Sequence, residues 1–339
     1  SNEPIIGATV QAVHQPSGSR YGTVTNVDGR YSIQGMRTGG PYRVEISYIG
    51  YQTVIYKDIT LQLGEVYNLN VEMSESSELL NEVIVTAAKT KFTAEKTGAT
   101  TNISSAQITQ LPTVNRSISD IARLSPYANG MSFAGGDGRS TNFTIDGANF
   151  NNNFGLSSNL PGGGNPISMD AIEEVQVVVA PFDVRQTNFI GGGINAITKS
   201  GTNTFRGTAY TYYRNQDMRG NRINGEDLGA RSDESKTTYG FTLGGPIIKN
   251  KLFFFVNYEK EKTPGEVIKY RAREDGEDAK GMVSRTLKSD MEKVYNHLKD
   301  KYGYDAGSYT NFPADEENTK LLARIDWNIT DRHRLSLRY

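Results

Sequence analysis

The feature that most constrains this sequence is the stretch Ile172–Asn203. It contains two β-rich runs, Val175–Val179 and Ile194–Thr198, separated by a turn at Ala180-Pro181 and the glycine triplet Gly191–Gly193. Runs of β-branched residues bounded by Gly, Pro and Asn are typical of strands. Consecutive glycines allow backbone conformations that other residues cannot adopt, and they let a neighbouring chain segment approach closely. The stretch therefore predicts two strands with a close backbone contact between them.

This stretch resembles the closing strands of the plug domain of TonB-dependent outer-membrane receptors. The family carries an Ile-Glu-x-Ile-Glu-Val run ending in Gly-Pro, then Gly-Gly-x-Ile-Asn-Ile-Thr-Lys. The chain matches at Ile172-Glu173, Val175, Val177, Gly192–Asn195 and Ile197–Lys199, whereas Ala180 replaces the glycine of the Gly-Pro pair. The segment Phe182–Gln186 looks like the Oar-like branch found in Bacteroidetes-type bacteria. The resemblance implies these plug-motif residues: Arg139, Asp146, Gly147, Glu173, Glu174, Gly192, Gly193 and Asn195.

Composition agrees with a β-rich chain. The sequence has 339 residues, of which 36% are hydrophobic, with 35 Gly and 19 Tyr. This composition favours an all-β chain with many turns, or a barrel with a wet interior. The net charge of −1 gives no bulk attraction to nucleic acid, and the absence of cysteine excludes disulfides and thiolate chemistry.

No apolar run approaches the roughly 18 residues that a transmembrane helix needs. We therefore expect that, if the chain crosses a membrane, it does so as a barrel. No signal peptide is evident, and Ser1-Asn2 resembles a mature or trimmed end.

Residues 1–74 alternate in short β-prone runs separated by turn signals such as Asp28-Gly29. The runs are Ala8–Val13, Thr23–Val24, Arg30–Ile33, Tyr42–Tyr48, Tyr51–Ile55 and Val66–Met73. This spacing predicts a small β-sandwich. The motifs around Gly7–Val10, Thr25–Tyr31 and Tyr48–Tyr51 resemble the carboxypeptidase-regulatory-like domain. We interpret Asp28 and Asp58 as surface carboxylates rather than metal ligands.

Residues 75–101 have the composition of a linker, and they contain a short β-prone run. The run resembles a TonB box, the segment that the inner-membrane energy-coupling protein TonB captures by strand addition. Its residues are Glu82, Val83, Ile84, Val85, Thr86 and Ala87. The alternative is an ordinary strand of the plug.

We expect the plug to span residues 102–203. Ser104–Ile108 predicts a serine-capped helix ended by Leu111-Pro112, and Ser117–Leu124 predicts a second short amphipathic helix. The segment Gly138–Gly147 resembles the family's hairpin, with Asp146-Gly147 as its turn.

The tract Ala148–Pro166 is too long for a passive connection in a compact domain. In the family such plug loops face the exterior and meet substrate, so the resemblance implies a weak set of contact residues: Asn149, Phe150, Asn151, Asn152, Asn153 and Phe154. The alternative is a disordered loop.

Residues 204–339 predict the first strands of an outer-membrane β-barrel. The expected strands are Phe205–Arg214, Thr238–Ile248, Lys251–Lys260, Thr319–Ile329 and Arg334–Tyr339. In Leu321–Ile329 an apolar face alternates with a charged or amide face, which is typical of a strand with lipid outside and water inside. A soluble sandwich gives the same alternation with the opposite orientation. About five strands cannot close a barrel, and receptors of the family have about 22, so we expect an incomplete antiparallel transmembrane barrel.

Two inserts, Asn215–Lys236 and Thr263–Asn318, interrupt these strands, and the resemblance implies that both are extracellular loops. Within the second, Asp290–Tyr302 predicts a helix, with core-like spacing of Met291, Val294 and Leu298.

No catalytic constellation is present: the three histidines are isolated, and neither a Gly-x-Ser-x-Gly elbow nor a phosphate-binding loop occurs. We therefore expect no enzyme activity, no cofactor and no metal. In the family, plug carboxylates face arginines of the barrel wall, a role that Glu173 or Glu174 could take with arginines beyond Tyr339.

The sequence thus predicts a mainly β chain: an N-terminal β-sandwich, an α+β plug and the start of a barrel. The resemblance implies a TonB-dependent transporter in the outer membrane of a Gram-negative cell, with the N-terminal domain and plug on the periplasmic side. Its expected partners are TonB, membrane lipid, an unidentified siderophore, glycan, peptide or protein as substrate, and a partner lipoprotein; nucleic acid is not expected. The alternative is a surface adhesin or secretion-associated barrel component without import.

Overall fold

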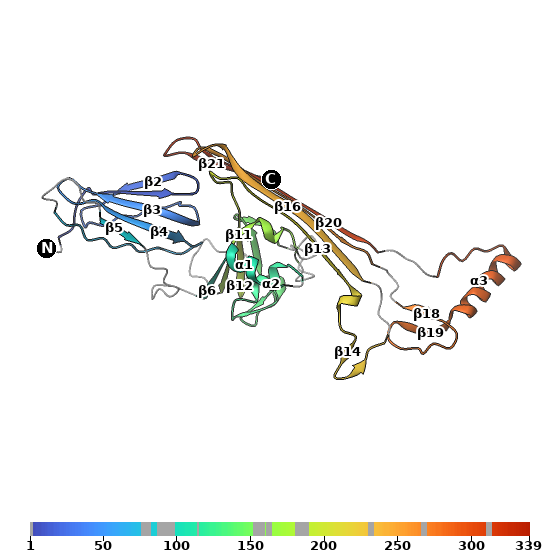
Figure 1. The fold of residues 1–339 in the computed structure, drawn as a ribbon. Helices are drawn as coiled ribbons and strands as arrows, with labels where there is room; N and C mark the ends of the chain where they lie inside the picture. Colours follow the sequence, from blue (N-terminus) through green and yellow to red (C-terminus); the bar gives the residue numbers. More distant parts are fainter. Residues whose placement is uncertain are drawn as a thin grey trace. The chain divides into compact units, whose positions relative to one another are not determined.

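A computed structural model describes residues 3–75, 83–86, 99–113, 115–151, 160, 165–179, 190–229, 234–265, 270–309 and 314–339. The chain divides into two compact units. The first comprises Ser1–Thr208, Thr242–Tyr258 and Lys320–Tyr339, and the second comprises Ala209–Phe241 and Glu259–Thr319. Figure 1 shows the elements in chain order, from the blue N-terminal strands to the red C-terminal ones.

The N-terminal domain is built on one five-stranded sheet of order β2-β1-β3-β4-β5. Its strands are β1 (Thr9–His14), β2 (Ser19–Val24), β3 (Gly39–Ser47), β4 (Val54–Leu61) and β5 (Val83–Thr86). Alternate side chains of β1 and β3, such as Val10, Tyr42 and Ile46, form its buried core.

Two runs expected as strands, Arg30–Ile33 and Val66–Met73, are not strands of any sheet. Alternate side chains of these two runs still face the core. Tyr31, Ile33, Leu69, Val71 and Met73 are partly buried and pack against it. The predicted second layer therefore exists as side-chain packing by these two runs, without a hydrogen-bonded ladder.

The plug contains a second five-stranded sheet, of order β10-β9-β12-β11-β6. Its strands are β6 (Ala99–Ser104), β9 (Asn142–Ile145), β10 (Ala148–Asn149), β11 (Ile172–Val179) and β12 (Gly192–Thr198). β12 pairs antiparallel with β11 and parallel with β9. The opening motif is therefore the centre of this sheet.

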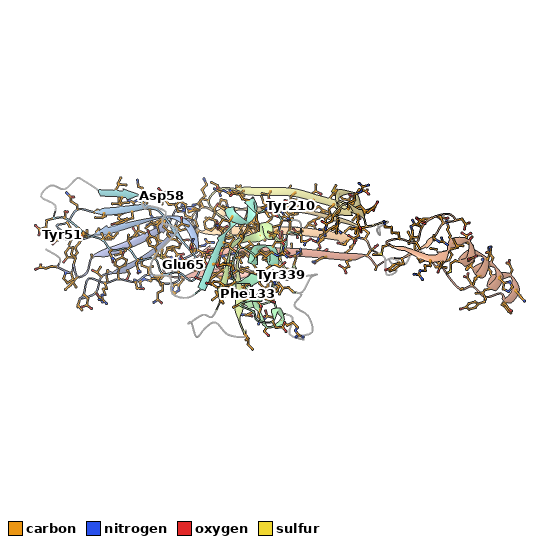
Figure 2. All side chains as sticks on the ribbon, turned by 90° about the horizontal axis from the view of Figure 1, so that it is seen from below. Tyr51, Asp58, Glu65, Phe133, Tyr210 and Tyr339 are labelled. Carbon is orange, nitrogen blue, oxygen red and sulfur yellow. The ribbon has the colours of Figure 1, made fainter. Side chains whose placement is uncertain are left out.

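The plug helices begin at the predicted serines. α1 (Ser105–Gln110) and α2 (Ile118–Ala122) both start with a capping box, at Ser104 and Ser117. Their apolar residues join the plug core with Phe133, Phe143 and Ile194. Short elements complete the plug: β7 (Ala128–Asn129), β8 (Ser132–Phe133), η1 (Gly138–Ser140) and η2 (Met169–Ala171). Figure 2 labels Phe133 among the plug side chains.

The third five-stranded sheet, which we call the wall, has the order β13-β16-β17-β20-β21. Its strands are β13 (Arg206–Asn215), β16 (Ser235–Ile248), β17 (Leu252–Thr263), β20 (Glu316–Asn328) and β21 (Arg334–Arg338). All five expected strands are present within a few residues of their predicted bounds.

The wall strand β20 is polar on its buried side and apolar on its exposed side, whereas β17 also buries Phe253 and Phe255. In β20 the side chains of Arg324 and Asp326 are 7% and 6% exposed, whereas Ile325 and Trp327 are 42% and 40% exposed. A strand of a soluble sandwich has the opposite arrangement. The wall therefore has the orientation of a membrane barrel strand, with its apolar residues outward.

The second unit carries the two inserts. The first insert holds η3 (Gln216–Met218) and the hairpin of β14 (Arg222–Ile223) and β15 (Glu226–Asp227). The second holds the parallel pair β18 (Arg271–Arg273) and β19 (Val283–Leu287), followed by α3 (Lys288–Tyr302). The helix is present as expected, but none of its residues is buried, so its apolar spacing does not form a core.

Among the described residues, no helix is both long and apolar enough to cross a membrane.

Candidate plug-to-wall site

Arg324 connects the wall directly to the last strand of the plug. Its Nη1 donates to the carbonyl oxygen of Thr198 at 2.7 Å and to the Thr198 Oγ1 at 3.0 Å. Its Nε and Nη2 donate to the two carboxylate oxygens of Asp326, at 2.8 and 3.0 Å. The planar guanidinium fork thus satisfies one partner on its own strand and one on the plug.

Asp146 is the plug carboxylate of this site, and the hairpin turn places it there. It adopts a positive φ of 49°, which Asp tolerates better than most residues, ahead of Gly147 at 86°. Its carboxylate accepts hydrogen bonds from the Thr198 backbone N–H at 3.1 Å and hydroxyl at 2.5 Å. The Arg338 Nε of β21 lies 2.8 Å from its Oδ2. Asp146 therefore connects the plug hairpin, the last plug strand and the wall.

Asp326 also contacts polar side chains from outside its own strand. The Ser336 hydroxyl donates to it at 2.6 Å, and the Arg37 Nη2 lies 3.3 Å from its Oδ2. Arg37 also donates to the Ser200 hydroxyl. Burial lowers the pKa of Arg37, and the charge of Asp326 opposes that change.

These residues form one network, which we call the plug lock: Arg37, Asp146, Thr198, Arg324, Asp326 and Arg338. It contains three arginines and two carboxylates, nearly balanced in charge. Removing one partner from a buried ion pair costs about 3–5 kcal/mol, because the other charge stays desolvated. Hydrogen-bonded groups can, however, exchange their partners for water. The network can therefore hold the plug while intact and release it once water enters.

A second polar feature crosses the plug sheet as a straight row. Paired positions place Thr144, Asn195, Gln176 and Asn102 side by side on four neighbouring strands. Thr144 donates to the Asn195 side-chain oxygen at 2.8 Å, and the Asn195 amide donates to Gln176 at 3.2 Å. The carbonyl oxygen of Leu63 accepts from Gln176 at 2.5 Å and from Asn102 at 3.2 Å. The row gives Asn195 of the motif a polar partner on each side.

Glu174 lies beside this row, and its carboxylate accepts the backbone N–H of Leu63 at 3.0 Å. It is 6% exposed, and burial raises its pKa to about 7. Glu173, its neighbour, is partly exposed. The expected pairing of Glu173 or Glu174 with wall arginines beyond Tyr339 stays a prediction. Among the described residues, the plug carboxylate that pairs with a wall arginine is Asp146, whose Oδ2 lies 2.8 Å from Arg338 Nε.

Close packing and backbone conformation explain why glycines occupy positions 191 and 192. Gly191 has a φ of +99°, which favours glycine, and a Cβ on Gly192 would lie 2.6 Å from the Phe133 ring. Gly192 and Gly193 are both buried. The triplet therefore lets β12 begin against the plug's aromatic core.

The expected TonB-binding residues fall partly outside the described residues, which exclude Glu82 and Ala87. Val83, Ile84, Val85 and Thr86 form β5, which pairs in parallel with β4. The alternative of a plug strand is wrong, since β5 belongs to the N-terminal sheet.

Of the expected substrate-contact residues, Asn152, Asn153 and Phe154 also lie outside the described residues. Asn149 is exposed and Phe150 is 37% exposed. Asn151 instead supports the hairpin: it accepts the Phe143 N–H at 2.6 Å and donates to Asn142 at 2.7 Å.

Arg139 forms an exposed ion pair with Asp137 at 2.6 Å, away from the plug lock. Of the predicted motif residues, the structure brings only Asp146 into the lock. The wall residues Arg324, Asp326 and Arg338 were not anticipated. The sequence indicates only that Arg324 and Asp326 lie on the charged face of an alternating strand. It does not show which residues contact that face. Within the described ranges no group of His, Cys, Asp or Glu could hold a metal ion.

A plug locked by buried polar groups to wall strands whose outer side is apolar defines a plugged outer-membrane barrel protein. Family models agree: residues 197–267 match the outer membrane beta barrel domain, and residues 1–74 match the carboxypeptidase regulatory-like domain. The TonB-dependent transporter Oar of Myxococcus xanthus is 24% identical, over 99% of this chain and 32% of the relative. The chain thus spans about a third of that relative's length.

Solved structures of outer-membrane receptors resemble the chain in part. The transporter YddB of Escherichia coli has a TM-score of 0.48 at 17% identity, over 71% of this chain and 32% of its own. The siderophore receptor PirA of Acinetobacter baumannii has a TM-score of 0.46 at 21% identity, over 71% and 31%. From the family models and the curated relative, the chain is a relative of the TonB-dependent receptors of the outer membrane.

Proposed function

We propose that this chain supplies the N-terminal domain, the plug and the first barrel strands of a TonB-dependent transporter that imports substrate through a plugged barrel. The proposed parts are residues 1–74, the linker 75–101 with the TonB-binding segment 82–87, the plug 102–203 and the barrel strands from 204. The observation that carries the proposal is the plug lock, in which buried Arg324 of the wall holds Thr198 of the plug at 2.7 Å. The relative Oar is named a TonB-dependent transporter, which supports import over adhesion.

The two interfaces of the plug suit a part that must move as a unit. Inside the plug, apolar residues such as Phe143, Ile121 and Ile194 are fully buried, so separating them would expose apolar area to water. The plug lock, by contrast, consists of ion pairs and hydrogen bonds that water can replace. A pull on the plug therefore disrupts the lock before it disrupts the plug core.

The energy source in this proposal is TonB, which captures residues 82–87 by strand addition and pulls on the plug from the periplasm. Substrate binding favours the pulled state only through contacts that differ between the two plug states. The substrate is a siderophore, glycan, peptide or protein, and a partner lipoprotein can assist its capture. Asn149 and Phe150 are the described candidates for contact with it. No enzyme chemistry is part of this function, and the relative Oar is named a transporter.

The test is deletion of residues 82–87 in the intact protein, followed by uptake assays with ferric siderophores, oligosaccharides and peptides. We expect the uptake that depends on the wild-type protein to fall to the level of a strain lacking TonB, at equal outer-membrane abundance. Unchanged uptake for every substrate would contradict the proposal and favour the adhesin or secretion alternative.

A further inference from the structure

The N-terminal domain contacts the wall through the hairpin that joins β1 to β2. We call its residues 16–21 the docking hairpin. The side-chain amide of Asn328, at the end of β20, donates to the Ser19 hydroxyl at 3.0 Å. The guanidinium of Arg334, at the start of β21, lies 3.9 Å from the centre of the Tyr21 ring, which suits a cation–π interaction. The docking hairpin therefore meets the wall where β20 turns into β21.

Buried hydrogen bonds fix the shape of the docking hairpin from within the N-terminal domain. Ser17 and Ser19 are 0% and 2% exposed, and their hydroxyl oxygens lie 2.9 Å apart. The Nδ1 of His14 lies 2.7 Å from the Ser17 hydroxyl. Burial, with the charge of Arg37, lowers the pKa of His14 to about 4, so this residue is neutral near pH 7. A surface already held in its bound shape loses little conformational freedom on docking, which favours a stable contact.

The wall presents its own hydrogen-bonded cluster to the docking hairpin. Asn203, at the end of the plug, and Asn250, in the turn between β16 and β17, are joined by two hydrogen bonds of 2.7 Å. The backbone carbonyl oxygen of Asn250 accepts from Asn328 at 3.0 Å. The Asn203 backbone N–H donates to the carbonyl oxygen of Pro16 at 2.8 Å. One cluster thus connects the docking hairpin to two turns of the wall.

The N-terminal domain holds the plug sheet through the backbone of Leu63, just after β4. The N–H of this residue donates to Glu174 at 3.0 Å, and its carbonyl oxygen accepts from Gln176 at 2.5 Å and from Asn102 at 3.2 Å. A Cβ on Gly64 would lie 2.6 Å from the Gln176 Nε2, so the two surfaces are in close contact. These are the hydrogen bonds of a single residue, and water can replace each of them once the plug moves away.

We propose that the N-terminal domain stays on the wall during transport, and that the plug separates from it at Leu63. The inference rests on the proposed function, because it assumes that the plug leaves the wall during import. Besides the docking hairpin, the wall side includes the ion pair between Arg37 and Asp326 at 3.3 Å. Because breaking a largely buried ion pair costs more than exchanging the hydrogen bonds of one residue for those to water, the plug side separates first. The N-terminal domain thus restrains the plug in addition to the plug lock.

Two cross-links in the intact protein test the two sides of this proposal. Ser19→Cys with Asn328→Cys holds the docking hairpin on the wall, and residues 1–339 contain no other cysteine. A short, cleavable, thiol-specific reagent joins the two thiols, and mass spectrometry measures the extent of linking. In cells producing the protein, uptake should continue at the rate of the unlinked double variant. Uptake that stops on linking and returns on cleavage would overturn the proposal, because the domain would then have to leave the wall.

Leu63→Cys with Asn102→Cys holds the domain on the plug instead. Leu63 binds through its backbone, so replacing its side chain leaves the hydrogen bonds to Glu174 and Gln176 in place. We expect linking to stop uptake, down to the level of a strain lacking TonB, and cleavage to restore it. Uptake that continues through fully linked protein would also overturn the proposal, because the plug would then carry the domain with it.

The four single-cysteine variants are the controls, since none can be linked within the molecule and the reagent should leave their uptake unchanged. If neither the wild-type protein nor any unlinked variant supports uptake, the proposed function itself fails. The proposal on the N-terminal domain fails instead through the response of the double variants to linking. The two failures are thus distinguishable.

Discussion

Arg324 is the residue in which the polar side of the wall and the end of the plug meet. A guanidinium that is 7% exposed must be matched by acceptors, and here Thr198 and Asp326 supply them at 2.7–3.0 Å. The sequence shows Arg324 on the charged face of its strand, but periodicity alone does not reveal the partner on the plug.

Replacing Arg324 by Ala should loosen the plug. The change removes four hydrogen bonds and leaves Asp326 with Arg37 and Ser336, so we expect plug docking to weaken by about 3–5 kcal/mol. The measurement is entry of a large antibiotic into cells that produce the intact protein. Arg332→Ala, in the exposed turn after β20, is the matched control and should leave permeability unchanged. Equal permeability of the two variants would contradict the role of Arg324.

Glu174 predicts a pH dependence of plug stability. Burial raises its pKa to about 7 from 4.5, so the folded plug binds more protons than the unfolded chain between these values. The free energy of unfolding should therefore fall as pH rises through this window and level off above about 7, with a total change on the order of 3 kcal/mol.

Glu174→Gln removes the titration, so the plug amides should lose less hydrogen-exchange protection between about pH 5 and pH 8, after correction for intrinsic rates. Glu173→Gln, the adjacent and more exposed residue, should keep the wild-type dependence. The same pH response in wild type and Glu174→Gln would refute this account of Glu174.

At the scale of elements, periodicity was sufficient where one face of a strand is buried. It predicted the wall strands, and the capping serines predicted where α1 and α2 begin. It failed for Arg30–Ile33 and Val66–Met73. Alternation shows which side chains face a core, but it does not show whether a neighbouring backbone is available for the hydrogen bonds of a sheet. Periodicity also missed β6, because its polar residues Thr100 and Thr101 were assigned to the linker.

The candidate site was predicted only in part for a related reason. Asp146-Gly147 was predicted as a turn from its residue types, and the turn conformation directs the Asp146 carboxylate toward Thr198. Its pairing with Arg338 depends on two segments far apart in sequence, which no local pattern encodes. The docking of Val83–Thr86 on β4 is likewise a long-range contact, so the sequence indicated a β-prone run without its partner.

The glycine triplet supplies a prediction for β12. Gly192→Ala would place a Cβ 2.6 Å from the Phe133 Cβ and Cγ, within a core where Phe133 is 1% exposed. We expect a cost of about 1–3 kcal/mol from overpacking, seen as faster hydrogen exchange in β11 and β12. Gly220→Ala, where a Cβ would meet no atom within 4 Å, is the control and should have no effect on these strands. Unchanged exchange in Gly192→Ala would show that Phe133 can move freely.

At the scale of the whole molecule, the chain combines an apolar plug core, a polar lock and a wall with its apolar side outward. Each arrangement follows from a different environment: a dry interior, an interface that water can enter, and lipid. The proposed transport cycle needs all three, since in it the plug stays folded while it separates from a wall that stays in the membrane. The chain accordingly belongs to an outer-membrane protein.

The central claim is that the plug must leave the wall for transport, and a cross-link tests it most directly. Thr198→Cys with Arg324→Cys places thiols on two residues whose side chains meet at 3.0 Å across the lock. The long Arg324 side chain supplies most of that reach, so a cleavable thiol-specific cross-linker joins them rather than a direct disulfide. In cells producing the intact protein, we expect the cross-linker to stop TonB-dependent uptake in the double variant and its cleavage to restore uptake, while either single variant is unaffected by the reagent. Uptake that continues at the wild-type rate through a fully cross-linked protein would contradict the account.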